Sequence, residues 1–329
     1  MASSRTGSID LLKEALAPLR PYLDDDDVNE VMINSANDVW VEKSGQISKV
    51  DVLISSHSLN SVVLILASME QKDALAGTDS GILDARMSGF RVAAILPPTS
   101  TKGTCISIRK HSVVNFSLGD LESKGAFGPE QTEILKKIVL QRKNVLVVGG
   151  TSSGKTTMLN AMIQEIPPED RVITIEDTQE LKVAVPNHVQ LESNAQRNVT
   201  PRMLVKASLR FRPDRILLGE VRGGEAYDLL NAANTGHDGV LATLHSNSAL
   251  KGLSRFENLV LQSGIDWPHA SICKEIADVF DYVVFVERAN GKRQLSEILE
   301  LHGYDMEARN YLFSYQFKRN DHEHHVAIN

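Results

Sequence analysis

The sequence predicts an α/β protein in which a smaller α+β N-terminal domain precedes a P-loop nucleotide-binding domain. Three observations support this fold class. From residue 129 onward, apolar runs alternate with helical segments, the pattern of a mostly parallel sheet flanked by helices. Before residue 112, short alternating runs predict paired strands and a helix. Residues 149–156 form a glycine-rich loop between an apolar run and a helical segment.

The N-terminal domain is expected over residues 1–112. Residues 9–19 predict a short amphipathic helix that ends near Pro18 and Pro21. Four consecutive aspartates at 24–27 are expected to lie in a solvated loop or helix start, with a metal site as the less favoured alternative. A helix and six strands are expected at 59–69 and at 31–34, 39–42, 47–53, 84–87, 90–96 and 105–110.

A linker and the second domain follow. Residues 113–128 predict the linker, because glycines are frequent there and apolar anchors are few. The second domain is expected over 129–320, and it starts with a helix at 129–141 that has proline in its first turn. Its strands are expected at 144–148, 171–175, 215–219, 239–243 and 281–286. The tail at 321–329 contains a histidine cluster, for which a frayed terminus is favoured over a metal site.

Composition narrows the class of protein. The chain has 329 residues, of which 42% are hydrophobic and 23% charged, as in ordinary globular proteins. The net charge of −7 disfavours a nucleic-acid-coating surface, so we expect no direct nucleic-acid binding. Cys105 and Cys273 are isolated, which disfavours a disulfide scaffold and suits a reducing cytosol. The start of the chain lacks a signal-peptide pattern, and the longest aliphatic run, 62–67, is too short to span a membrane. Any membrane contact is therefore expected to be peripheral.

The loop at 149–156, here called the phosphate loop, matches the pattern G-x-x-x-x-G-K-[ST] at every fixed position. Such a loop wraps backbone N–H groups around a phosphate at a helix N-terminus, while the lysine binds phosphate and the hydroxyl binds Mg²⁺. A chance glycine-rich turn is the alternative, but it would rarely bring a strand and a helix in this order. The predicted nucleotide-binding residues are Gly149, Gly150, Thr151, Ser152, Ser153, Gly154, Lys155, Thr156 and Thr157.

Two carboxylates follow apolar runs in the second domain. Glu176 ends the run at 171–175, and Glu220 follows the run at 216–219. Carboxylates at the carboxyl ends of parallel strands face the crevice where ligands bind. We therefore predict that Glu176 orients or activates the attacking water. Glu220 is predicted to hold Mg²⁺ through its water shell, together with Thr156. Surface or capping roles are the alternatives.

Histidines and arginines complete the candidate site. His237 and His245 bracket the strand expected at 239–244, and a histidine past a strand end can contact the γ-phosphate. A structural hydrogen bond is the alternative for either. Arginine suits phosphate because its fork donates two hydrogen bonds. The arginines that could bind phosphate, within or between subunits, are Arg91, Arg109, Arg210 and Arg222, beside other nearby arginines at 86, 212 and 215.

Four ordered segments resemble a known family. Together with the phosphate loop, residues 174–177, 212–226 and 234–249 resemble the Asp-box, Walker B and His-box of secretion-superfamily ATPases. Residues 106–111 also fit. The chain looks most like the VirB-eleven-type traffic ATPases of type IV secretion systems, in the conjugative-transfer TrbB branch. The chain departs from the family pattern in three ways: a glutamate after glycine replaces the usual Walker B aspartate, Asp238 replaces a proline, and the tail after Phe317 has no motif to match.

The resemblance implies a RecA-like second domain, a homo-hexameric ring and ATP bound with Mg²⁺ between the two domains. It implies a cytoplasmic protein at the inner-membrane face that works with other type IV secretion components in pilus assembly and substrate transfer. Lys155 and Thr156 match its phosphate and Mg²⁺ binders, Glu176 the catalytic carboxylate, Glu220 the Walker B acid and His245 the His-box contact. Arg91 and Arg109 resemble the N-terminal arginines that reach the nucleotide in this family.

Three other functions stay open from the sequence. A type II secretion or type IV pilus motor is the first. Secretion and extension motors often carry a four-cysteine metal insert, whereas this chain has two isolated cysteines. Retraction motors have a shorter gap between the two box histidines than the one from His237 to His245. A scaffold or switch that binds ATP with negligible turnover shares Lys155 with a hydrolase and is not distinguished from it. A motor that grips DNA is disfavoured by the negative net charge.

Overall fold

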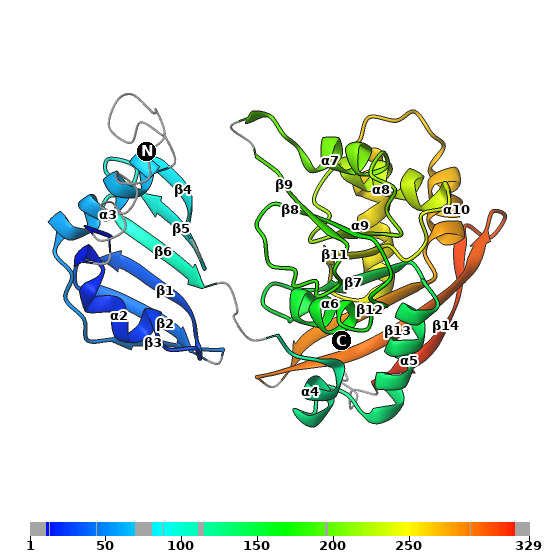
Figure 1. Cartoon of the computed structure of the whole chain (residues 1–329), viewed down its shortest axis with the longest axis horizontal. Coiled ribbons are helices and arrows are strands. Elements are labelled where there is room, and N and C mark those ends of the chain that lie inside the picture. Colours follow the sequence, from blue (N-terminus) through cyan, green and yellow to red (C-terminus); the bar gives the residue numbers. More distant parts are fainter. Residues whose placement is uncertain are drawn as a thin grey trace, which may run out of the picture. The chain divides into compact units, whose positions relative to one another are not determined.

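The computed structural model describes residues 11–12, 14–43, 45–69, 81–87, 89–110, 115–194, 197–289 and 291–319. The histidine-containing tail predicted at 321–329 lies outside these residues. The chain forms two compact units, Met1–Val114 and Asn115–Asn329, each with its own core. Figure 1 shows the first unit in blue to cyan and the second in green to red.

The first unit is built on a six-stranded antiparallel sheet in the order β3-β2-β1-β6-β5-β4. Alternate residues of its strands, such as Val31, Ile106 and Val92, are buried against α3 (Ser56–Met69), while their neighbours face away from this core. The strands are β1 (Val28–Ser35), β2 (Asp38–Lys43), β3 (Gln46–Val50), β4 (Ile82–Met87), β5 (Phe90–Ile95) and β6 (Cys105–Lys110).

The segment before β1 differs from the single helix predicted at 9–19. Residues 11–12 and 14–15 are helical, and they are followed by the 3₁₀ helix η1 (Ala17–Leu19) and by α2 (Arg20–Leu23). Pro21 lies in the first turn of α2 rather than after a helix end. A proline is tolerated there because the first turn has no use for its missing N–H.

The second unit contains an eight-stranded sheet in the order β14-β13-β12-β7-β11-β10-β8-β9. The six strands from β12 to β9 pair in parallel, and the long β13–β14 hairpin adds two antiparallel strands beyond β12. The strands are β7 (Val145–Gly149), β8 (Val172–Glu176), β9 (His188–Glu192), β10 (Arg215–Leu218), β11 (Leu241–His245), β12 (Tyr282–Ala289), β13 (Lys292–Asp305) and β14 (Asn310–Lys318).

Helices cover both faces of this sheet, as the alternation of the strand residues requires. Leu146 and Val148 of β7 pack in one core with helices α7 to α10, whereas Val145 and Val147 pack in the other core with α4 to α6. The helices are α4 (Leu118–Ser123), α5 (Pro129–Leu140), α6 (Lys155–Ile163), α7 (Pro201–Ser208), α8 (Glu225–Asn234), α9 (Ala249–Leu261) and α10 (His269–Val279). Among the described residues, none of the helices has the length and apolar character to cross a bilayer.

The segment predicted as a linker at 113–128 is largely folded. Residues from 115 onward belong to the second unit, and α4 begins with a capping box between Ser117 and Asp120. Leu118 is fully buried in the same core as α5 and α6. Leu118 thus packs this segment into the core of the second unit, although the glycine content of the segment predicted a linker.

Candidate functional site

The phosphate loop connects β7 to α6 and has the backbone that its glycines permit. A Cβ at Gly149 would lie 2.3 Å from the Val286 carbonyl oxygen and 2.4 Å from Ser153 Oγ, so only glycine fits. Gly154 has φ of +99°, a left-handed conformation that favours glycine, and it directly precedes α6. The loop therefore places the N-terminus of α6 where backbone N–H groups can bind an anion.

Arg293, the second residue of β13, supports this loop from outside. Its Nε donates to the carbonyl oxygen of Ser152 at 3.1 Å, and its side chain lies over Gly154. The local sequence around residue 293 does not predict this contact, because β13 lies more than a hundred residues from the loop in sequence. Arg293 was therefore not predicted from the sequence.

Four neighbouring strands each end at a predicted site residue. In the order β7, β11, β10 and β8, the carboxyl ends carry the phosphate loop, His245, Glu220 just beyond Gly219, and Glu176. The register confirms the proximity of the first two, since His245 of β11 pairs with Gly149 of β7. Parallel strands thus gather at one edge residues that are far apart in sequence.

Lys155 lies at the start of α6 and is largely buried, with 8% of its surface exposed. Its ammonium group donates to the carbonyl oxygen of Gly150 at 2.8 Å and lies 3.3 Å from His245 Nδ1. An ammonium group can only donate, so His245 Nδ1 accepts and its Nε2 carries the proton. Nε2 then donates to Glu220 Oε1 at 2.9 Å.

The pKa of His245 is lowered, first by burial and then by the neighbouring charge of Lys155, while Glu220 acts in the opposite direction. The neutral ring is the form that the tautomer just described requires. The neutral imidazole of His245 adds no charge between the Lys155 ammonium and the Glu220 carboxylate. Its two hydrogen bonds hold both groups in position.

The far oxygen of Glu220 continues this network. Glu220 Oε2 accepts from Arg222 Nη2 at 2.5 Å, and Arg222 Nη1 donates to Asp177 Oδ2 at 3.0 Å. Asp177 Oδ1 also accepts from the Ser193 hydroxyl at 2.6 Å. Arg222 therefore bridges Glu220 and Asp177, and the pairing of Asp177 with Arg222 was not predicted from the sequence.

Glu176, the last residue of β8, is only 3% exposed. Its Oε1 accepts from the backbone N–H groups of Glu180 and Leu181, at 2.8 and 2.9 Å, whereas its Oε2 is buried with no hydrogen-bond partner among the described residues. Burial raises the pKa of Glu176 to about 7, although the two backbone hydrogen bonds act to lower it. The carboxyl group therefore changes its charge near neutral pH.

The position of Glu176 explains one departure from the Walker B pattern. A Cβ at Gly219 would lie 2.9 Å from Glu176 Cγ, closer than real Cβ contacts. The glycine before Glu220 therefore leaves the space through which the Glu176 side chain passes. An aspartate at 219 would displace that side chain.

Unpaired buried groups test whether a nucleotide with Mg²⁺ fits this edge. Besides Glu176 Oε2, the Ser153 hydroxyl of the phosphate loop is buried without a hydrogen-bond partner among the described residues. Buried polar atoms are usually paired in folded proteins. Together with the helix N-terminus and Lys155, they are polar groups to which a phosphate and its water could hydrogen-bond.

Two predicted candidates lie at the other edge of the sheet. His237 precedes β11, whose first residue pairs with the first residue of β7, so it is far from the phosphate loop. Its Nδ1 lies 3.1 Å from the carbonyl oxygen of Ala232. This contact is the structural hydrogen bond that was the alternative to a phosphate contact for this histidine. Arg210 is exposed at the end of α7, before β10 begins, and donates to the carbonyl oxygen of Lys206.

Arg215 has a structural place as well. It is fully buried, and its Nε donates to Asp170 Oδ2 at 2.6 Å. Asp170 also accepts from Arg142, which follows α5. This cluster joins the starts of β8 and β10 at the edge opposite the phosphate loop.

Arg91 and Arg109 belong to the first unit. They face each other across β5 and β6, and Arg109 also faces Glu30 of β1. Arg91 forms a two-pronged ion pair with Asp84, at 3.2 and 2.8 Å. The arginines lie on the face of the sheet that is turned away from the α3 core, since their neighbours Val92 and Ile108 are buried.

Comparisons with known proteins show the family of this chain. A model of the family "Type II/IV secretion system protein" matches residues 13–289. The "Probable conjugal transfer protein TrbB" of Sinorhizobium fredii is 34% identical over 96% of this chain and 96% of its own length. The "Type IV secretion system protein VirB11" of Bartonella henselae is 31% identical, over 90% of this chain and 94% of its own.

The fold is also found in solved structures. The Legionella pneumophila ATPase DotB is 19% identical and superposes with a TM-score of 0.61, covering 93% of this chain and 82% of its own. The predicted fold class, a RecA-like P-loop domain with a smaller α+β domain, is confirmed. The predicted resemblance to type IV secretion ATPases is confirmed by the relatives. The chain therefore belongs to the Type II/IV secretion system protein family.

Proposed function

We propose that this chain is a Mg²⁺-dependent ATPase that powers type IV secretion, with conjugative transfer and pilus assembly as its processes. The observation that carries the proposal is the set of four neighbouring strand ends that bring together the phosphate loop, His245, Glu220 and Glu176. Relatives named as conjugal transfer and type IV secretion proteins support the biological process.

Each residue has a proposed part in hydrolysis. Lys155 and the N-terminus of α6 bind the phosphates, and Thr156 with Glu220, through water, holds Mg²⁺, which neutralises charge on the phosphate oxygens when bound. Glu176 accepts a proton from the water that attacks the γ-phosphorus, while the bond to the ADP oxygen breaks. A pKa of about 7 suits a general base that works near neutral pH.

His245 links this chemistry to the rest of the network. It lies between Lys155 and Glu220, so a γ-phosphate that draws the ammonium group away from Nδ1 also changes the restraint on Glu220. Loss of the γ-phosphate restores the original contacts. This is the proposed means by which the site reports hydrolysis to the remainder of the unit.

Assembly and location also belong to the proposal. The family resemblance supports a homo-hexameric ring at the cytoplasmic face of the inner membrane, working with other type IV secretion components and making peripheral membrane contact. It also supports Arg91 and Arg109 as phosphate contacts. We expect no direct nucleic-acid binding, because the net charge is −7.

The decisive experiment measures ATP binding and phosphate release for three variants of the full chain. Glu176→Gln keeps the shape and the two backbone hydrogen bonds but removes the base, so we expect normal ATP binding and at least a hundredfold slower release. Lys155→Ala should lose binding. Glu169→Gln makes the same chemical change at an exposed position of the same unit and serves as the control.

The outcomes separate the alternatives. Unchanged release by Glu176→Gln would remove the role proposed for Glu176. If the wild type binds ATP but releases phosphate no faster than Lys155→Ala at every protein concentration, the chain is a nucleotide-dependent scaffold or switch.

A further inference from the structure

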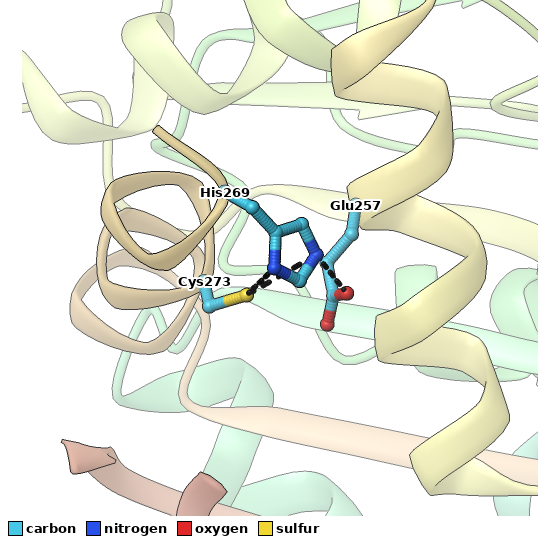
Figure 2. A group of neighbouring side chains, drawn as sticks. All are labelled: Glu257, His269 and Cys273. Carbon is cyan, nitrogen blue, oxygen red and sulfur yellow. Dashed lines mark hydrogen bonds and ion pairs between the residues drawn. The ribbon is translucent and has the colours of Figure 1, made fainter. Parts of the chain in front are cut away.

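Away from the phosphate loop, three side chains with different metal-binding atoms meet between α9 and α10. Glu257 extends from α9 toward His269 and Cys273, which are one turn apart on α10 (Figure 2). Their ligand atoms all lie within 4.8 Å of one another. His269 Nε2 is 3.0 Å from Glu257 Oε2 and 3.7 Å from Cys273 Sγ.

These distances match the spacing of ligands around one small cation. With metal–sulfur bonds of about 2.3 Å and metal–nitrogen or metal–oxygen bonds of about 2.0–2.1 Å, ligand atoms of a tetrahedral zinc site are about 3.3–3.6 Å apart. Both measured separations are within a few tenths of an ångström of that range. The spacing of His269 and Cys273 by four positions places both side chains on the same face of α10.

The carboxylate is held in position by a further contact. The Tyr311 hydroxyl of β14 donates to Glu257 Oε1 at 2.7 Å, so Oε2 is the oxygen left for a ligand. Hydrogen bonds of this kind orient the ligands of protein metal sites. The phenol groups of Tyr304 and Tyr311 also contact the thiol of Cys273, so the β13–β14 hairpin lines the inner side of the cluster.

Burial divides the cluster into an inner and an outer part. Cys273 is 1% exposed and Glu257 8%, whereas over half of the His269 side chain is exposed. A cation can therefore enter from solvent past the imidazole, and water is available as a fourth ligand.

We propose that Glu257, His269 and Cys273 bind one divalent transition-metal cation of the zinc class, which joins α9 to α10 beside the β13–β14 hairpin. The combination of thiolate, imidazole and carboxylate selects this class over Mg²⁺ or Ca²⁺, which prefer all-oxygen sites. The site is separate from the one proposed for ATP, so its metal would stabilise the second unit rather than take part in hydrolysis.

The test uses Co²⁺ as a spectroscopic probe on the full chain after treatment with a chelator. Wild-type protein should develop a near-ultraviolet thiolate-to-cobalt absorption band that corresponds to one Co²⁺ per chain, and the band should be lost in Cys273→Ser. Cys105→Ser is the matched control, because it removes the other cysteine, which lies in the first unit, and should keep the band. The histidines near the C-terminus can bind Co²⁺ but cannot produce a thiolate band.

A second variant and a second measurement guard against misfolding of Cys273→Ser. Glu257→Gln keeps an acceptor for Tyr311 and should bind Co²⁺ at least tenfold more weakly. Zn²⁺ in hundredfold excess over its Kd should raise the Tm of the wild type by about 5 °C or more, and leave Cys273→Ser unchanged. Folded wild-type protein without a thiolate band at saturating Co²⁺, or a band that survives Cys273→Ser, would overturn the proposal.

Discussion

Glu176 has two oxygens in contrasting surroundings, and the contrast suits a base. Oε1 is fixed by two backbone N–H groups, while Oε2 is buried and unpaired among the described residues. Burial raises its pKa to about 7. Since only the carboxylate can take a proton from water, kcat should rise with pH and reach half its maximum near pH 7. The measurement is a kcat profile from pH 5.5 to 8.5 at saturating ATP and Mg²⁺.

The same burial predicts a stability difference with a definite sign. The pKa of Glu176 is higher in the folded state, so its contribution to stability is fully present below about pH 4.5 and is lost as pH rises through about 7. At pH 8, Glu176→Gln should therefore be more stable than the wild type by about 3 kcal/mol, and the difference should vanish near pH 4.5. The prediction is contradicted if kcat does not change with pH and if the wild type and Glu176→Gln are equally stable at pH 8. Burial would then not raise the pKa of Glu176.

At the scale of single residues, the sequence predicted side chains that follow recognisable strands. Lys155, Glu220 and His245 could be found because each follows a short apolar run or a fixed motif position. Arg293 and Gly219 could not be assigned their roles in this way. Each acts on a partner that is distant in sequence, one over Gly154 and the other beside Glu176. Such contacts depend on the strand order, which the local pattern does not contain.

At the scale of elements, the central strands were predicted within about two residues, whereas β9, β13 and β14 were missed. The predicted strands are buried on both faces and are continuously apolar, as β7 and β8 show. The β13–β14 hairpin mixes buried and exposed positions over strands that pair antiparallel at the edge. Its sequence therefore lacks the apolar run that identified the others. The cluster of Glu257, His269 and Cys273 was missed for a different reason, because it joins residues of α9 and α10 that meet only in the folded unit.

The start of β10 depends on one buried ion pair. Arg215 is fully buried, its two Nη atoms have no hydrogen-bond partner among the described residues, and Asp170 is its counter-ion. Asp170→Asn removes that charge and leaves the guanidinium uncompensated. We expect a loss of about 3–5 kcal/mol in the free energy of unfolding, measured by urea denaturation.

A matched control distinguishes burial from ion pairing as such. Asp278 of α10 pairs with Lys274 at the surface of the same unit, with both side chains about half exposed. Asp278→Asn should cost at most about 0.5 kcal/mol. Equal effects of the two substitutions would mean that the Asp170 cluster contributes no more than a surface pair.

At the scale of the whole molecule, the proposed ring gives a reason for the position of Arg210. In a head-to-tail ring, each subunit meets its two neighbours with different surfaces. An arginine that acts on the nucleotide of a neighbour must therefore lie away from its own phosphate loop. Arg210 is exposed before β10 begins, at the edge opposite the loop, and meets this requirement. Arg222 lies beside Glu220 and does not.

Mixing two inactive variants tests this arrangement. Arg210→Ala keeps an intact phosphate loop, and Lys155→Ala keeps an intact arginine, so each alone should lose most ATPase activity. In rings assembled from equal amounts, about one interface in four joins an intact loop to an intact arginine, and the mixture should regain about a quarter of the wild-type rate. Light scattering with Mg²⁺ and an ATP analogue establishes that rings form. If Arg210→Ala alone is fully active, or mixed rings stay inactive, then Arg210 does not act on a neighbouring subunit.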